Sequence, residues 1–108
     1  MHTVQRNTDQ LNGFSVPASA AGKGILFGSY SSGEVRVPST SALVGPLTWY
    51  SGDALYGPWY PCQDGAGNAV TSTIAAGNAC LIPVNCFGCK YILPVAATAG
   101  LINIDLKA

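Results

Sequence analysis

Hydrophobic and polar positions alternate with a period of two along several short stretches of this chain. The clearest stretch is residues 101–107, where Ile102, Ile104 and Leu106 alternate with polar side chains. A strand with this pattern buries one face and leaves the other in water. No segment keeps apolar residues at the spacing i, i+3, i+4, i+7 for long enough to predict a helix. The pattern therefore predicts an all-β protein.

Glycine, proline and asparagine divide the chain into short segments that read as strands. The predicted strands lie at residues 24–30, 34–38, 47–51, 59–63, 69–74, 79–84, 90–96 and 101–107. Between them, Asp64-Gly65, Gly67-Asn68 and Gly77-Asn78 supply residues that tolerate the positive φ of tight hairpins. Short strands separated by frequent turns are typical of an antiparallel β-sandwich or a jelly roll. We expect a single antiparallel β-sandwich domain that is jelly-roll-like.

The start of the chain has a different character. Residues 1–12 are polar and show no periodicity, which predicts an extended N-terminal arm that is flexible or orders only against a partner. The β-domain is then expected at residues 13–108, a length that suits one domain. The opening segment has no apolar run of the kind that a secretory signal needs. Residues 65–89 carry no charge, but glycine, asparagine and proline interrupt them too often for a membrane-spanning helix.

The chain carries unusually little charge. Only 9% of its residues are charged, against about 25% in ordinary soluble domains. Five basic and five acidic residues give no net charge. Binding to nucleic acid or to an anionic membrane depends on clustered basic residues, so neither partner is expected. A surface with few charges does little to prevent association, so we expect neighbours in an assembly to cover much of it.

Four cysteines, Cys62, Cys80, Cys86 and Cys89, raise the question of metal or redox chemistry. A structural zinc site usually joins two short knuckles, and only Cys86 and Cys89 form one. A redox pair of the thioredoxin type needs its CxxC at the start of a helix in a βαβ unit, which the pattern does not predict. Buried free thiols behave as small hydrophobic groups. Structural thiols or one incidental disulfide are favoured over zinc or redox chemistry, so no metal or cofactor is expected.

Groups for acid–base catalysis are scarce. The single histidine is His2 in the polar arm, so a serine or cysteine nucleophile has no credible base. We expect Asp64 to be a turn residue, Asp53 to lie in a loop and Asp105 to lie on the wet face of the last strand. The segment GKGILFG lacks the residue order of a phosphate-binding loop. We therefore expect no catalytic residues and no enzymatic activity.

Aromatic residues gather in the stretch LTWYSGDALYGPWY, which contains Trp49, Tyr50, Tyr56, Trp59 and Tyr60. In one interpretation, both tryptophans pack into the core while the tyrosines cap its edges and keep their hydroxyls wet. In a second, some of these side chains form an exposed surface that docks against a neighbouring subunit, because Tyr and Trp dominate interface hot spots. In a third, the same surface stacks on sugar rings. The sequence leaves all three open.

A longer pattern covers residues 43–107, rather more than half of the chain. It contains the run LTWYSGDALYGPWYPCQDGAGNAVTSTIAAGNACLIP, the step CFGCKYILPVAA and the closing strand GLINIDLK. This order of strands and turns resembles small β-sandwich structural proteins of tailed bacteriophage virions, of the capsid decoration or cement type. The pattern has no catalytic signature. The four cysteines depart from the family pattern, and they neither support nor exclude the resemblance.

The resemblance implies a non-enzymatic virion protein that binds the outside of the shell and stabilises contacts between capsomers. Such a protein would be synthesised in the host cytoplasm and located on the capsid surface. Its partners would be the major capsid protein or other virion subunits, in a symmetric assembly of identical copies. The expected contact residues are Val4, Arg6, Asn7, Tyr56, Trp59 and Tyr60. The alternatives are a minor tail or fibre component and a module that binds a surface glycan.

Overall fold

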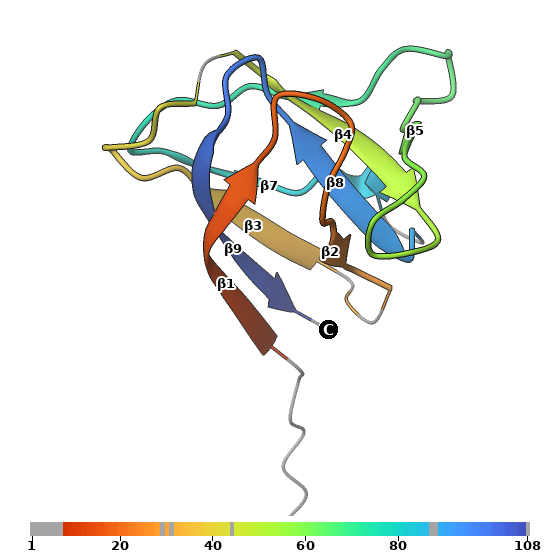
Figure 1. Ribbon diagram of the computed structural model, residues 1–108, viewed down its shortest axis with the longest axis horizontal. Helices are drawn as coiled ribbons and strands as arrows, with labels where there is room; N and C mark the ends of the chain where they lie inside the picture. Colours follow the sequence, from red (N-terminus) through yellow and green to blue (C-terminus); the bar gives the residue numbers. More distant parts are fainter. Residues whose placement is uncertain (1–7, 29, 31, 44, 87–88, 108) are drawn as a thin grey trace, which may run out of the picture.

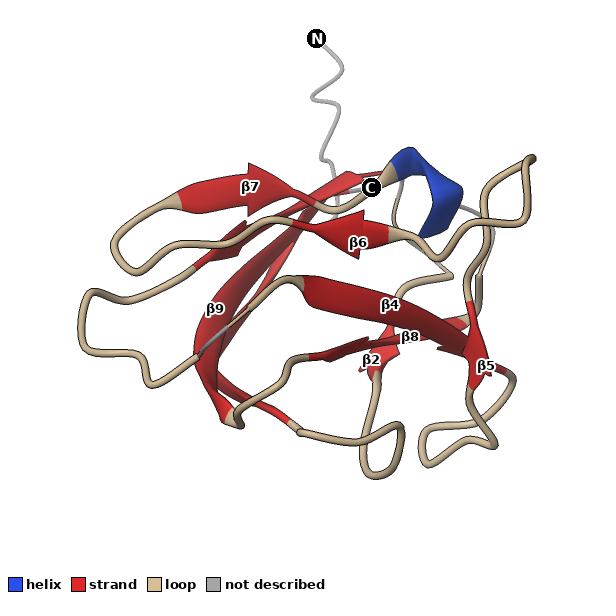
Figure 2. Cartoon of the chain, turned by 90° about the horizontal axis from the view of Figure 1, so that it is seen from above, coloured by secondary structure: helices blue, strands red, loops and turns tan. Residues whose placement is uncertain are grey.

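Two antiparallel sheets pack face to face in the computed structural model, which describes residues 8–28, 30, 32–43, 45–86 and 89–107 (Figure 1). Figure 2 shows the two layers from above. This arrangement confirms the predicted all-β sandwich. The described residues include one short 3₁₀ turn, η1 (Val84–Cys86), and no helix that is long and apolar enough to cross a membrane.

The first sheet has the strand order β1–β9–β3–β7. Its strands are β1 (Thr8–Val16), β9 (Gly100–Lys107), β3 (Ser32–Arg36) and β7 (Ala79–Leu81). The second sheet has the order β2–β8–β4–β5, and β6 also pairs with β4. Its strands are β2 (Ile25–Leu26), β8 (Tyr91–Val95), β4 (Leu47–Gly52), β5 (Tyr60–Pro61) and β6 (Thr71–Ser72). β4 is therefore the central strand of the second sheet.

Every strand predicted from the sequence overlaps an observed strand, but several observed strands are much shorter. β2 and β5 have two residues each, where residues 24–30 and 59–63 were expected to be extended. Glycine and proline weaken or end a hydrogen-bonded ladder, and both residue types lie inside these segments. The second sheet is consequently built around its two longer strands, β4 and β8.

β1 begins at Thr8, before residue 13 where the sequence predicts the domain to start. It pairs with β9 from Thr8 to Leu11 and again from Phe14 to Val16. Residues 8–12, which the sequence assigns to the arm, therefore lie in β1, where β9 pairs with the backbone of the first four of them. Residues 1–7 lie outside the described residues, and the arm remains a prediction there.

The core lies between the two sheets. Ile102, Ile104 and Leu106 on β9 are at most 1% exposed, which confirms the alternation read from the sequence. Leu47 and Trp49 on β4 are fully buried and belong to the same hydrophobic cluster. Full burial of an aliphatic side chain of this size contributes about 1.5–3 kcal/mol. The inner faces of β9 and β4 therefore supply much of the energy that holds the sheets together.

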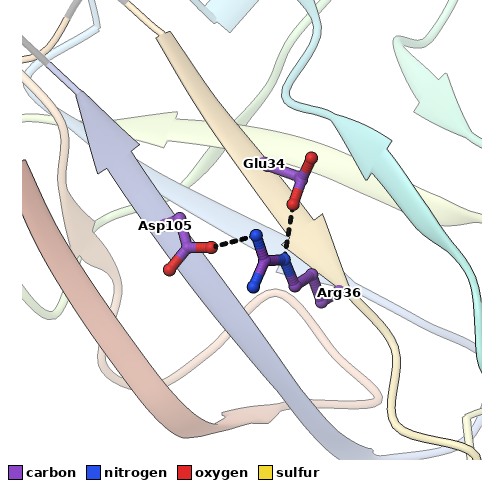
Figure 3. A network of polar contacts seen from close by, with 3 residues as sticks. All are labelled: Glu34, Arg36 and Asp105. Atoms are coloured by element: carbon purple, nitrogen blue, oxygen red, sulfur yellow. Dashed lines mark hydrogen bonds and ion pairs between the residues drawn. The ribbon is translucent and has the colours of Figure 1, made fainter.

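The outer face of the first sheet carries a small ionic network, shown in Figure 3. The Arg36 guanidinium donates to the Glu34 carboxylate through Nε and to Asp105 Oδ2 through Nη2, the latter at 3.1 Å. Glu34 on β3 lies opposite Asp105 on β9, so the arginine links neighbouring strands. Asp105 is on the polar face of β9, as the alternation predicts. Exposed pairs of this kind contribute little stability, but they occupy two of the chain's carboxylates.

Candidate functional site

The aromatic stretch begins with β4 itself, and its later part forms the connection between β4 and β5, residues 53–59. Two backbone hydrogen bonds fix its path. The Gly57 amide donates to the Ala54 carbonyl at 3.0 Å, and the Gly24 amide donates to the Leu55 carbonyl at 2.7 Å. The first bond closes a turn within the connection, and the second ties the connection to the segment that precedes β2. We call residues 53–60 the aromatic loop.

Trp59 anchors the aromatic loop by packing its indole ring against glycine backbone. A Cβ atom at Gly24, Gly52 or Gly57 would lie 2.1, 2.9 or 2.9 Å from the nearest ring atom. Real Cβ atoms do not approach that closely, so the contact depends on glycine at all three positions. The indole Nε1 also donates to the Gly22 carbonyl at 3.1 Å. Trp59 is half-buried and holds the loop in place.

Tyr56 and Tyr60 are on the solvent side of the aromatic loop, with 69% and 61% of their surface exposed. Trp49, in contrast, is fully buried. The structure thus divides the aromatic cluster, with Trp49 in the core, Trp59 as the anchor and two tyrosines exposed. The core interpretation holds for Trp49, and an exposed aromatic surface is present at the two tyrosines.

The contact roles predicted for these residues remain predictions. Trp59 lies between the two exposed tyrosines in sequence, but its ring faces its own chain, so it serves the loop itself. The other predicted contact residues, Val4, Arg6 and Asn7, lie outside the described residues.

A second exposed apolar surface lies where β7 runs into η1. Leu81 is 73% exposed and Val84 is 72% exposed, and β7 is one of the two edge strands of its sheet. Between them, Ile82 is 3% exposed and packs over Gly33 on the inner face. The sequence did not indicate this surface, because Leu81, Ile82 and Val84 all belong to one apolar run. Such a run does not tell which of its side chains face water.

Three of the four cysteines come together beside β4. The Cys62 amide donates to the Trp49 carbonyl at 2.9 Å, and the Cys62 carbonyl accepts from the Val70 amide at 3.0 Å. Cys86 ends η1, and the Cys89 amide donates to the Cys86 carbonyl at 3.2 Å. The thiols of Cys86 and Cys89 both lie within hydrogen-bonding reach of the Cys62 sulfur. We call these three residues the thiol cluster; all are free thiols.

The contacts within the thiol cluster give its three members different pKa values. Donation by Cys86, with smaller contributions from Cys89 and the Ser51 hydroxyl, lowers the pKa of Cys62 to about 7 although burial opposes this. The hydrogen bond to Cys62, followed by burial, raises the pKa of Cys86. Burial is the main cause that raises the pKa of Cys89. Cys62 is therefore the member of the cluster that loses its proton most readily.

Cys80 lies on β7, opposite Val35 of β3. It is half-buried and lines a different hollow, together with Val37 and Ile74. Burial, and then the negative charge of Glu34, raise its pKa. Within the described ranges, no group of three or more His, Cys, Asp or Glu side chains is placed to hold a metal ion.

Asp64 has the structural role that the sequence predicts. Its Oδ1 accepts hydrogen bonds from the Ala66 amide at 2.8 Å and from the Asn68 amide at 3.0 Å. These bonds, led by that from Asn68, lower the pKa of Asp64. Gly67 follows with a φ of 83°, which closes the turn. The carboxylate therefore organises the turn between Gln63 and its bridge partner Ala69.

Comparison of the chain with models of protein families, with curated proteins and with solved structures finds no match.

Proposed function

We propose that this chain is a non-enzymatic structural protein of a virion, a capsid decoration (cement) protein that binds the outside of the shell and stabilises capsomer contacts. The observation that carries the proposal is the pair of exposed tyrosines on an anchored loop. Tyr56 and Tyr60 offer large aromatic surface to a partner, while Trp59 holds the loop that presents them. The resemblance of residues 43–107 to virion β-sandwich proteins supplies the class of partner.

The geometry of the aromatic loop favours binding because little has to be ordered when a partner arrives. Ordering loops and side chains at an interface lowers affinity, and a rigid loop avoids much of that cost. Tyrosine adds apolar area and a hydroxyl with few rotatable bonds, so it is enriched among hot spots. A rigid aromatic contact repeated by symmetry on a shell would add up to strong attachment even where each contact is small.

The use of the charged groups supports a structural role. Asp64 caps a turn, and Glu34 and Asp105 hold Arg36 on the outer face of the first sheet. Three of the five carboxylates in the chain therefore take part in structural contacts. A surface with so few free charges can be covered by a neighbour without removing many ions from water, which is costly.

Co-sedimentation of the purified protein with virions and emptied shells tests the proposal. We expect stoichiometric binding by the wild-type protein and a loss of affinity of about tenfold or more for Tyr56→Ala and Tyr60→Ala, as is usual for hot spots. Leu101→Ala is the matched control, because Leu101 is also apolar and 53% exposed but lies on β9. A folded wild-type protein that ignores shells, or tyrosine variants that bind as Leu101→Ala does, would refute the proposal.

The contribution of the arm can be measured in the same experiment. The deletion should remove residues 1–7 only, because residues 8–11 pair with β9 and their loss would damage the sheet. We expect this deletion to weaken shell binding while leaving the unfolding curve unchanged. Unchanged binding would remove Val4, Arg6 and Asn7 from the contact surface and leave the aromatic loop as its main part.

Carbohydrate binding is the second candidate, because the same exposed tyrosines could stack on sugar rings. A glycan array distinguishes it from shell binding. Glycan binding that vanishes in Tyr56→Ala and Tyr60→Ala, in a protein that does not sediment with shells, would favour this candidate. Trp59→Ala is the weaker probe, since loss of its ring would free the loop from Gly22 and Gly24.

A further inference from the structure

The proposed shell contact does not use the thiol cluster, whose three members differ in access to solvent. Cys62 is 8% exposed and Cys86 is fully buried. Cys89 is half-buried, so a small reagent in solution reaches the cluster at this residue first. The backbone hydrogen bonds of Cys62 to Trp49 and Val70 fix the position of its main chain beside β4.

We infer that Cys62 and Cys89 form a thiol–disulfide site that reacts with low-molecular-weight disulfides such as oxidised glutathione. Two observations carry this inference. Cys89 packs against the hydrophobic cluster that contains Cys62, and its thiol lies within hydrogen-bonding reach of the Cys62 sulfur, so the two sulfur atoms are neighbours. Cys89 is also the member of the cluster that an external disulfide can reach. The inference is independent of shell binding.

The reaction proceeds by two exchanges. Cys89 gives its proton to water and its thiolate attacks one sulfur of the small disulfide RSSR, so that the S–S bond of RSSR breaks and RS⁻ leaves. The Cys62 thiolate then attacks the Cys89 sulfur of this mixed disulfide, and the second RS⁻ leaves. Both RS⁻ groups take up protons. The net result is one Cys62–Cys89 disulfide, with RSSR reduced to two RSH.

Each member of the cluster has a different part in this chemistry. The hydrogen bonds that Cys62 accepts keep a substantial fraction of it as thiolate at neutral pH, which makes it the attacking group in the second exchange. Cys86, which solvent does not reach, makes the largest contribution to the lowered pKa of Cys62. Cys80 takes no part, because it belongs to a different hollow beside β3.

Thiol counting and peptide mapping of the full chain test the inference. The reduced protein is incubated with oxidised glutathione in the presence of EDTA, and thiols are counted after denaturation. We expect the count to fall from four to two. Trypsin cannot map the bond, because all four cysteines lie between Arg36 and Lys90 in one peptide. Chymotrypsin with a protease that cuts before aspartate separates them, since Asp64, Leu81 and Phe87 lie between successive cysteines.

The expected product is a linked pair of peptides that contain Cys62 and Cys89. A link to Cys86 or Cys80, or a count that stays at four, would overturn the inference. This measurement uses the wild-type protein, so it does not depend on whether a variant folds.

Three variants make the test sharper. Cys62→Ser removes the group that resolves the mixed disulfide, so we expect one glutathione adduct to accumulate on Cys89. Cys89→Ser should slow thiol loss by about tenfold or more, because the remaining cluster thiols are buried. Cys80→Ser is the matched control and should still lose two thiols at the wild-type rate. An adduct elsewhere, or equal slowing in Cys80→Ser and Cys89→Ser, would contradict the assignment.

Discussion

The two tryptophans show how one residue type serves two different purposes in this chain. Trp49 is fully buried, and its Nε1 donates to the Ser72 hydroxyl at 2.9 Å within the core. Trp59 is half-buried, and its Nε1 donates to a backbone carbonyl at 3.1 Å. In both cases the polar end of the ring has a partner, as burial of an indole requires. The partner differs because Trp49 is enclosed by two sheets, whereas Trp59 lies against a surface loop.

The Trp49–Ser72 bond gives the first prediction. Ser72→Ala would leave the Trp49 N–H buried without an acceptor, which costs about 1–3 kcal/mol. We expect the free energy of unfolding to fall by that amount, measured by urea denaturation. Thr71→Ala is the control, because Thr71 is the exposed neighbour on the same strand, and its change should be within about 0.5 kcal/mol. Equal effects in the two variants would mean that the hydrogen bond contributes nothing.

At the residue scale, the sequence predicted which side chains alternate into the core. It did not predict which polar group would accept the hydrogen bond of the buried Trp49 ring. Ile102, Ile104 and Leu106 are buried as the period of two predicts. Ser72 lies in a run of small and polar residues, and nothing in that run marks it as an acceptor for Trp49. A partner of this kind depends on strand pairing across the sheet, which one sequence does not determine.

At the element scale, a bulge in β1 explains why the alternation of apolar and polar residues did not predict this strand. The register of β1 with β9 shifts between Leu11 and Phe14, and the intervening Gly13 has a φ of 73°. The Gly13 amide donates to Asn103 Oδ1 at 2.9 Å at this irregularity. An extra residue in one strand shifts its side-chain alternation by one position. Leu11 and Phe14 both pack against the core, but they are three positions apart and so do not match a period of two.

The aromatic loop gives the second prediction at this scale. In Gly24→Ala, the new Cβ would lie 2.1 Å from Trp59 Cη2 and 2.9 Å from the Ile92 carbonyl oxygen. Because backbone blocks one side, the ring has to leave its place, and overpacking of this kind costs about 1–3 kcal/mol. We expect lower stability in urea together with a change in tryptophan fluorescence.

Gly65→Ala is the matched control for that experiment. A Cβ at Gly65 would meet nothing within 4 Å, and its backbone is outside the left-handed region. Its stability should stay close to wild type or rise slightly, as expected for a site that tolerates alanine. If the two variants behaved alike, Trp59 would not depend on Gly24 for its position. The sequence placed the aromatic residues in one stretch, but the glycine that receives Trp59 is distant in the chain and was not predictable.

At the scale of the whole molecule, folding brings together groups that the sequence keeps apart. The sequence singles out the Cys86/Cys89 knuckle. The free Cys62 thiol lies near this knuckle because β5 pairs with β4 and Cys62 directly follows β5. The spacing along the chain gave no signal for this contact. The sandwich itself was predictable, because alternation and turns are local properties. The thiol cluster depends on tertiary packing and was not.

This packing links the stability of the reduced protein to pH. The pKa of Cys62 is lowered from its usual 9.0 to about 7, so between these values the unfolded chain holds a proton on Cys62 that the folded chain has lost. Cys62 on its own then makes stability rise with pH across this window, by roughly 2 kcal/mol, and the other three cysteines offset part of this rise as pH approaches 9. Above about pH 9 the direction reverses, because the raised pKa values of Cys80, Cys86 and Cys89 keep these groups protonated only in the folded state.

The third prediction is therefore a maximum in stability near pH 8 to 9, measured by urea denaturation of the fully reduced protein between about pH 6 and 10. Cys62→Ser is the decisive comparison, because it keeps every other titrating group and removes the one that gains stability as pH rises. Its stability should not rise between pH 7 and 9 but should fall as pH approaches 9, because burial still raises the pKa of the remaining cysteines. A wild-type curve that likewise does not rise above pH 7 would show that no thiolate is held at Cys62. A rise that persists in Cys62→Ser would assign it to another group.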